Sequence, residues 1–240
     1  MKTLIVVPCY NESKRLKQEE FITFANEHSD IDFLFANDGS RDNTLEVLQQ
    51  LTSKHPQLHL LDIQPNGGKA EAVRKGMLYA AENMNADLIA FWDADLATPL
   101  YEIPNMIAWA EKGYDIVMGL RLMRLGAKVK RKSSRHYLGR CFATCASLML
   151  DLPVYDTQCG AKMFRAQVVK DIFPESFSTR WLFDVEILAR YKKRYGKETA
   201  TQKIYEFPLF QWIDVDGSQL KSRDFFKAPM ELMKIKRRYK

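Results

Sequence analysis

Two carboxylates stand one residue apart in Asp93-Ala94-Asp95, directly after the apolar run 88–92. The run has the length of a buried strand, and such a strand carries the residues after it to the ligand-binding edge of an α/β sheet. Paired carboxylate oxygens suit Mg²⁺ or Mn²⁺, and these ions suit a phosphate-bearing substrate. Because Asp-x-Asp is also common in solvated turns, the motif needs support from the rest of the chain.

Three further apolar runs end in polar motifs, which are Tyr10-Asn11-Glu12, Asn37-Asp38-Gly39-Ser40 and Gly67-Gly68-Lys69. Together they offer carboxylates for ribose or base donors, glycines for close backbone approach and a lysine for phosphate. This combination predicts a site for a nucleoside diphosphate. The P-loop spacing GxxxxGK[ST] and the dinucleotide fingerprint GxGxxG are both missing, which argues against those two kinds of site.

The elements that must position these motifs alternate between strands and helices. We expect strands at 4–7, 33–36, 58–63, 88–92 and 117–120, and helices at 15–27, 43–53 and 70–83. Ser40 or Asp42 is expected to cap the second helix. Repeated strand–helix order predicts an α/β fold with a single Rossmann-like, mostly parallel sheet flanked by helices, whose strand ends gather along one edge.

The composition is that of an ordinary globular protein, with 46% hydrophobic and 28% charged residues among 240. This length favours one large domain, and we place it at 1–222, followed by a basic amphipathic tail at 223–240. No apolar run reaches the roughly 18–20 residues that span a bilayer, and the first residues do not resemble a signal peptide. The four cysteines have no CxxC pairing and are expected to be reduced thiols of a cytoplasmic protein.

Positive charge is concentrated in two places. Residues 120–150 contain eight Lys or Arg and no acid, and a second basic cluster lies at 234–240. Such clusters favour nucleic acid, an anionic membrane or a phosphorylated substrate. The segments 137–150 and 225–233 could be amphipathic helices in peripheral contact with a membrane, or could pack against the core. We expect no nucleic acid partner, because aromatic residues do not interleave with the basic ones and the strand-end motifs would be unused.

The ordered motifs resemble those of family 2 glycosyltransferases, which have a GT-A fold. The resemblance is carried by 7–12, 37–42, 66–69 and 93–95, and it continues toward the dolichyl-phosphate glucosyltransferase branch in 93–98, 156–164, 180–186 and Trp212 with Gly217-Ser218. It covers roughly residues 3–222. The chain departs from the family pattern at Asn37, where an aspartate is usual, and at Ala97, where some relatives have glutamine, so a metal ligand could be replaced by water.

The resemblance implies roles for individual residues. Pro8, Tyr10, Glu12 and Asp38 would hold the uridine of a nucleotide-sugar donor, Asp95 would bind the metal, and Asp93 would lie near the sugar or a second metal position. Lys69 is either a donor ligand or a surface lysine, and an anion at its helix start would favour the first. Arg121, Arg131 and Arg135 could clamp the acceptor's phosphate, because planar guanidinium groups bind phosphate bidentately.

We therefore expect a metal-dependent inverting glycosyltransferase, using Mg²⁺ or Mn²⁺, that moves a hexose from a nucleotide sugar, with UDP-glucose preferred, to a polyprenyl or dolichyl phosphate at the cytosolic membrane face. A phosphate acceptor needs no strong base, whereas a sugar hydroxyl would need one, and Asp156 is then the candidate. Cys159 is not expected to be a nucleophile. The alternatives are a soluble family 2 enzyme that extends a glycan and a nucleotidyltransferase.

Overall fold

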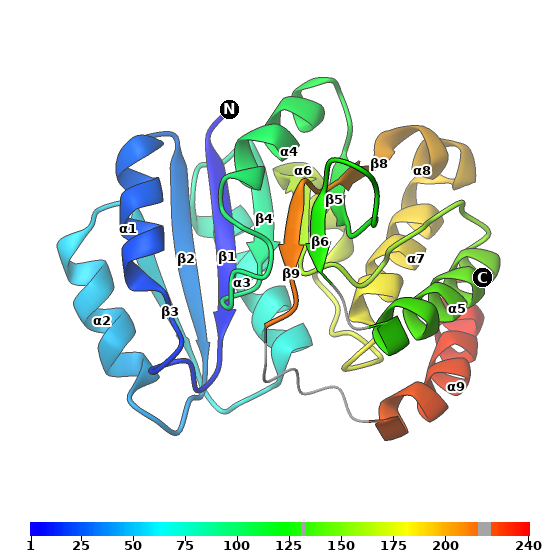
Figure 1. The fold of residues 1–240 in the computed structure, drawn as a ribbon, viewed down its shortest axis with the longest axis horizontal. Helices are drawn as coiled ribbons and strands as arrows, with labels where there is room; N and C mark the ends of the chain where they lie inside the picture. Colours follow the sequence, from blue (N-terminus) through cyan, green and yellow to red (C-terminus); the bar gives the residue numbers. More distant parts are fainter. Residues whose placement is uncertain (131–132, 216–221) are drawn as a thin grey trace.

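A seven-stranded sheet forms the centre of the protein, as seen in a computed structural model (Figure 1). The structure describes residues 1–130, 133–215 and 222–240, with the backbone alone for 133–136 and 222–226. The strand order is β3-β2-β1-β4-β7-β5-β8, and the pair β6-β9 forms a second small sheet. The bounds are β1 Thr3–Cys9, β2 Ile31–Asp38, β3 Leu58–Ile63, β4 Leu88–Trp92, β5 Ile116–Leu120, β6 Lys128–Lys130, β7 Ala161–Arg165, β8 Ile204–Pro208 and β9 Gln211–Ile213.

Helices cover both faces of the large sheet (Figure 1). Their bounds are α1 Gln18–Glu27, α2 Thr44–Lys54, α3 Lys69–Asn83, α4 Glu102–Glu111, α5 Ser133–Leu150, α6 Ala166–Ile172, α7 Phe183–Tyr195, α8 Lys197–Lys203 and α9 Ser222–Arg238. Apolar residues of α1, α2 and α4 share one core with one face of the sheet, while α3 and α5–α9 share the other. The predicted mostly parallel sheet flanked by helices is therefore confirmed.

The central strands β1 and β4 are apolar along almost their whole length because both of their faces are covered. In β1, Leu4 and Val6 belong to the core under α3, whereas Ile5 and Val7 belong to the core under α1. Successive side chains of a strand point to opposite faces, so each strand supplies both cores. In β1 and β4 this burial places polar side chains at the strand ends, whereas β7 buries Lys162 within the sheet.

β7 is the exception to the parallel order, because it runs antiparallel between β4 and β5. Its first residue, Ala161, pairs with Trp92, the last residue of β4. The reversal thus brings the start of β7, rather than its end, to the edge where β4 ends. As a result, the backbone N–H of Asp93 donates to the carbonyl of Gly160 at 3.1 Å, and the loop before β7 joins the strand-end motifs.

Some expected boundaries differ from the observed ones. The first helix begins at Gln18 rather than near residue 15, and neither Ser40 nor Asp42 is the residue that precedes α2, which is Asn43. Asp42 still accepts the N–H of Thr44 at 3.1 Å. The final helix α9 packs with α5 and α7, and its Leu232 and Ile235 are buried in the same core as those helices.

Candidate functional site

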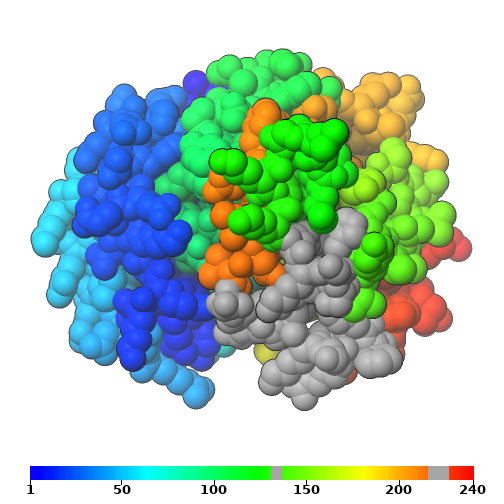
Figure 2. Space-filling view, viewed as in Figure 1, coloured from blue at the N-terminus to red at the C-terminus, as the bar shows by residue number. Residues whose placement is uncertain are grey.

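A cavity of about 900 Å³ lies along the carboxyl ends of β1, β2, β4 and β5. Every predicted site residue whose side chain the structure describes lines it: Pro8, Tyr10, Glu12, Asp38, Lys69, Asp93, Asp95, Arg121 and Asp156. The side chains of Arg131 and Arg135 lie outside the described residues. In Figure 2, the segments 121–130 and 211–215 lie side by side over the centre of the visible face, where β6 pairs with β9.

At the β1 end of the cavity, Glu12 presents one carboxylate oxygen that has no hydrogen-bond partner among the described residues. Its backbone N–H donates to Thr44 Oγ1 at 2.8 Å, and its Oε1 accepts from Arg15 at 2.7 Å. Its Oε2 is buried and lacks a hydrogen bond within the described structure. Burial raises the pKa of Glu12, an effect that Arg15 opposes and that Asp95 and Asp42 reinforce. The free oxygen can accept a hydrogen bond from a ligand hydroxyl.

Asp38 binds the neighbouring loop through both carboxylate oxygens. Oδ1 accepts the N–H of Gly67 at 2.8 Å, while Oδ2 accepts the N–H of Gly68 at 2.7 Å and the amide of Asn66 at 2.9 Å. Gly68 has a φ of 87°, a conformation that glycine adopts readily. Asp38 therefore shapes the turn that leads to Lys69, a role that the isolated motif did not indicate.

The departure from the family pattern at Asn37 has a local cause. Its side-chain amide donates to Asp62 Oδ1 at 2.6 Å, and its Oδ1 accepts from the hydroxyl of Ser40 at 2.6 Å. Asn37 is fully buried. An aspartate at position 37 would place its carboxylate next to that of Asp62 in a buried position, where the two charges would repel each other. Asparagine instead donates a hydrogen bond to Asp62.

Lys69 is the first residue of α3, and its Nζ lies 2.5 Å from Asp93 Oδ1. Burial alone would lower the pKa of Lys69, but Asp93, Asp184 and Asp95 outweigh it and raise the pKa. The side chain is 47% exposed because it extends into the open cavity. The anion beside this helix start is therefore the carboxylate of Asp93. Direct binding of a donor by Lys69 stays a prediction.

Asp95 and Asp93 lie close enough to influence each other but differ in their partners. Asp95 Oδ1 accepts the N–H of Ala97 at 3.0 Å, whereas Asp93 has Lys69 as its cation. Burial, followed by the charge of Asp93, raises the pKa of Asp95. Bringing two carboxylates together on a partly buried wall is unfavourable unless a cation joins them, as at many functional sites.

The close approach of Asp93 depends on Gly160. A Cβ atom at position 160 would lie 1.9 Å from Asp93 Oδ2 and 2.3 Å from its Cγ. Any side chain would therefore displace the carboxylate, so Gly160 is a positioning residue for Asp93. In the sequence, Gly160 was only one member of a motif, with no indication of this role.

The donor set of this wall fits Mg²⁺ or Mn²⁺ shared with a substrate. Within the parts of the chain that the structure describes, there is no group of three or more His, Cys, Asp or Glu side chains that could hold an ion alone. Mg²⁺ is commonly bound by one or two carboxylates together with substrate phosphates and water. Asp95, with Asp93 beside it, matches that pattern and leaves room for a diphosphate.

Arg121 and Asp156, two predicted site residues 35 positions apart, bind each other. Arg121 Nε and Nη2 each donate to one oxygen of Asp156 at 2.7 Å, and the backbone N–H of Arg121 adds a third contact at 3.1 Å. Burial of Arg121 works against its charge, but Asp156 more than compensates and raises the pKa of the guanidinium. Both carboxylate oxygens of Asp156 are thus engaged by Arg121, so Asp156 can act by holding this guanidinium in place.

A second buried ion pair, Lys162 with Asp184, was not predicted. Lys162 is wholly buried within β7, and its Nζ donates to Asp184 Oδ1 at 2.6 Å and to the carbonyl of Cys159 at 2.5 Å. Burial raises the pKa of Asp184, and Lys162 opposes the effect. Burial also raises the pKa of the Cys159 thiol, which agrees with its exclusion as a nucleophile. A lysine inside an otherwise apolar strand was the available signal.

The far wall of the cavity, toward α5 and α7, combines cations with apolar rings. Arg140 stacks on the ring of Tyr155, with its Cζ 3.3 Å from the ring centroid. The ring centroids of Trp181 and Phe142 lie 5.6 Å apart. Arg180 and Trp181, which belong to the motif 180–186, line the cavity here. Neither Arg140 nor Arg180 has a carboxylate within ion-pair distance among the described side chains. This wall is suited to an anion attached to an apolar group.

Comparison with known proteins gives consistent results. A model of "Glycosyl transferase family 2" matches residues 4–173. The dolichyl-phosphate β-glucosyltransferase ALG5C of Trichomonas vaginalis is 32% identical, over 97% of this chain and 70% of the relative. The dolichyl-phosphate β-glucosyltransferase of Saccharomyces cerevisiae is 29% identical, over 98% of this chain and 74% of the relative.

The solved structures give the same fold. Glucosyl-3-phosphoglycerate synthase from Mycobacterium tuberculosis, crystallised with Mn²⁺, UDP-glucose and phosphoglyceric acid, superposes with a TM-score of 0.70. The match covers 99% of this chain and 79% of the other, at 14% identity. At that identity the likeness concerns the fold alone.

Proposed function

The chain belongs to glycosyl transferase family 2, as its motifs predicted, and from this premise we propose that it transfers glucose from UDP-glucose to a polyprenyl phosphate. It has the predicted GT-A fold and is a glycosyltransferase. The names of its relatives support the lipid acceptor, since those proteins are dolichyl-phosphate β-glucosyltransferases. The M. tuberculosis enzyme was crystallised with UDP-glucose and Mn²⁺, which supports the same donor and a divalent ion here.

The observation that carries the proposal is the composition of the far wall of the cavity. Arg140 and Arg180 are cations without a carboxylate partner in the described part of the chain, and they stand beside Phe142 and Trp181. A polyprenyl phosphate is itself an anion joined to an apolar chain. Cations close to apolar rings therefore match a polyprenyl phosphate better than an uncharged sugar, which is usually bound by hydrogen bonds from neutral groups.

The donor is assigned to the β1 and β4 end of the cavity. Glu12 Oε2, which has no hydrogen bond within the described part of the chain, would accept one from a ribose hydroxyl. Asp38 would keep the turn before Lys69 in place. Lys69 would place its charge near the donor phosphates. Asp95, with Asp93, would hold Mg²⁺ or Mn²⁺, and the bound ion would supply positive charge at the diphosphate.

The reaction needs little proton chemistry from the protein. An oxygen of the acceptor phosphate attacks the anomeric carbon of glucose, while the bond from that carbon to the nucleotide diphosphate breaks and its electron pair leaves with the diphosphate. One such displacement inverts the anomeric configuration. The acceptor oxygen is already anionic, so positioning and electrostatic stabilisation account for catalysis. Asp156 would fix Arg121 at the acceptor phosphate rather than remove a proton.

Contact with a membrane surface is expected for a lipid acceptor. No described helix is long and apolar enough to cross a bilayer. Apolar side chains are nevertheless exposed to solvent. Leu125, whose side chain is 99% exposed, is two residues from Met123, which lines the cavity. Met230 and Met233 are exposed on α9, where the sequence also contains Lys and Arg. Exposed apolar groups beside Lys and Arg suit a surface of anionic lipid. We propose that the protein binds such a surface peripherally.

A transfer assay tests the proposal. Purified protein is incubated with radiolabelled UDP-glucose, Mn²⁺ and polyprenyl phosphate in detergent, and the product is partitioned between water and organic solvent. We expect label in the organic phase that depends on the polyprenyl phosphate. Label that stays in the aqueous phase as a new glycan would instead indicate the soluble, glycan-extending alternative. Formation of UDP-glucose from UTP and glucose 1-phosphate, with no lipid present, would indicate a nucleotidyltransferase.

A further inference from the structure

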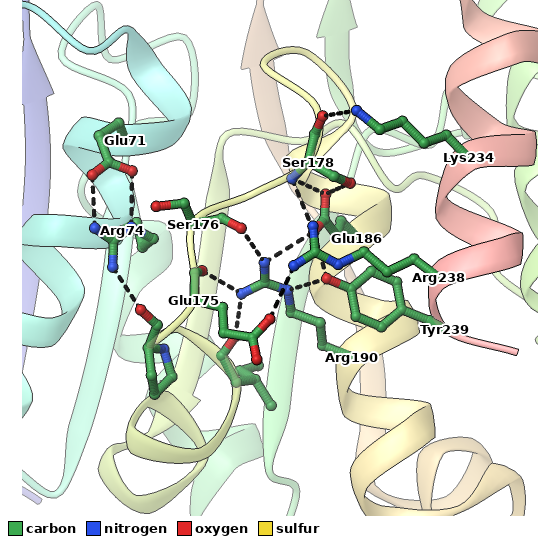
Figure 3. Close-up of polar contacts among 12 residues, drawn as sticks. Glu71, Arg74, Glu175, Ser176, Ser178, Glu186, Arg190, Lys234, Arg238 and Tyr239 are labelled. Carbon is green, nitrogen blue, oxygen red and sulfur yellow. Dashed lines mark hydrogen bonds and ion pairs between the residues drawn. The ribbon is translucent and has the colours of Figure 1, made fainter.

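The segment 173–182, between α6 and α7, carries Arg180 and Trp181 to the far wall of the cavity. It contains no helix or strand of its own. Its conformation must therefore be set by contacts with its surroundings. Most of its described side-chain hydrogen bonds and ion pairs come from two charged side chains of α7 and from α9 (Figure 3).

Arg190 of α7 uses all five of its guanidinium N–H donors. Nη1 donates to the carbonyls of Ile172 at 2.9 Å and Glu175 at 2.7 Å, and Nη2 donates to the carbonyl of Ser176 at 2.8 Å. The remaining two donors reach Glu186 Oε1 at 2.9 Å and the hydroxyl of Tyr239 at 3.1 Å. Arg190 thus binds three backbone carbonyls in the stretch of chain that leads to Arg180.

Glu186, also on α7, holds the second half of the segment. It is fully buried, and its carboxylate accepts the backbone N–H of Ser178 at 2.9 Å and the Ser178 hydroxyl at 2.7 Å. It does not line the cavity, although its neighbour Asp184 does. A buried carboxylate is stable only when its oxygens are well satisfied, so Glu186 requires its remaining partners as well.

α9 completes this arrangement from the other side. The hydroxyl of Tyr239, just beyond the helix, donates to Glu186 Oε1 at 2.7 Å and accepts from Arg190 Nε. Lys234 Nζ donates to the carbonyl of Ser178 at 2.9 Å, and Arg238 Nη2 lies 3.0 Å from Glu175 Oε2 (Figure 3). No described side chain of α9 lines the cavity. Tyr239 contacts Glu186 and Arg190, and both of these bind the segment 173–182, so the segment is a route by which α9 can influence the cavity.

We propose that Tyr239 is a positioning residue, which holds Glu186 and Arg190 in register and so sets the Arg180–Trp181 wall to which the acceptor binds. The proposal rests on the function proposed above, because that function assigns the wall to the acceptor. It makes α9 part of the acceptor site in addition to any contact with lipid. The donor end of the cavity, near Glu12 and Asp38, lies at the ends of β1 and β2 instead, so we expect donor binding to be unchanged.

The test compares Tyr239→Phe with Tyr191→Phe. Tyr191, which is fully buried, also donates its hydroxyl to a carboxylate, Asp115 at 2.6 Å, and this hydrogen bond lies outside the segment. Each variant is measured for acceptor KM, donor KM and the rate of tryptic cleavage after Arg180, an exposed residue. Two lost hydrogen bonds to charged groups can shift a local equilibrium about tenfold, and acceptor affinity falls with the fraction of protein in the binding arrangement.

We expect Tyr239→Phe to raise the acceptor KM about tenfold and to speed cleavage after Arg180, with the donor KM unchanged. Tyr191→Phe should leave all three at wild-type values. Equal changes in both KM values, or unchanged cleavage in Tyr239→Phe, would overturn the proposal. If wild-type protein glucosylates no polyprenyl phosphate, the proposed function fails; the cleavage rates, which need no substrate, then decide on their own whether Tyr239 positions the segment.

Discussion

Replacing Gly160 by alanine should displace the carboxylate of Asp93 while leaving its chemistry intact. The new Cβ would lie 1.9 Å from Asp93 Oδ2, whereas ordinary contacts between such atoms begin near 3.4 Å. One of the two groups must therefore move by about 1.5 Å. A misplacement of about 1 Å at a reacting centre can lower a rate by about 10²-fold, so we expect kcat to fall by at least that factor.

The matched control is Gly76→Ala on α3, whose Cβ would lie 2.5 Å from Val6 Cγ1 in the core. Both variants are overpacked and should lose about 1–3 kcal/mol of stability. Stability is followed by thermal unfolding, and kcat is measured for glucose transfer well below the melting temperature. Gly76→Ala should keep most of its kcat once folded. If Gly160→Ala were as active as Gly76→Ala, the close approach of Asp93 to Gly160 would not matter for catalysis.

Asp95→Asn should abolish transfer and also the rise in melting temperature that UDP with Mn²⁺ produces, and a retained rise would remove the metal assignment. Arg180→Ala should raise the acceptor KM about tenfold with little change in the donor KM, because a charge-assisted contact to the acceptor phosphate is lost. Glu71→Gln should lower the free energy of unfolding at neutral pH by about 1 kcal/mol, because the hydrogen bonds that the Arg74 guanidinium donates to the Glu71 carboxylate lower the pKa of Glu71. A carboxyl with a lowered folded-state pKa stabilises the protein above its ordinary pKa and loses this effect as pH falls through the folded-state value, so the variant and wild type should converge in acid, as seen in denaturant titrations at several pH values. Lys236→Ala with Arg237→Ala, both exposed, should weaken sedimentation with anionic vesicles while sparing neutral ones, and equal sedimentation would argue against lipid contact through α9.

The sequence predicts well those features that depend on neighbouring residues. Strands such as 88–92 are continuous apolar runs, helices such as α3 have apolar residues at helical spacing, and each motif comes directly after its strand. Parallel topology then places the motif ends together without any knowledge of side-chain contacts. For this reason the sequence predicts the fold, the family and nine of the residues that line the cavity.

Contacts between distant residues could not be predicted in this way. The reversal of β7 depends on its pairing with both β4 and β5, and only that reversal brings Gly160 to Asp93. Glu102 is a further example, since its buried Oε1 accepts the N–H groups of Phe210 and Gln211, more than a hundred residues away. Such partners leave no periodic pattern in the chain. The same holds for Arg121 and Asp156, which were named separately but act as a pair.

The identity of the product tests the proposed lipid acceptor most directly. Wild-type protein is incubated with UDP-glucose and Mn²⁺, in parallel with polyprenyl phosphate and with the matching polyprenol, and the lipids are examined by mass spectrometry. We predict that the polyprenyl phosphate gains one hexose and that the polyprenol gains none. The polyprenol lacks the phosphate that Arg121, Arg140 and Arg180 in the cavity lining would bind. Equal modification of both lipids, or of neither, would contradict the assignment of a polyprenyl phosphate acceptor.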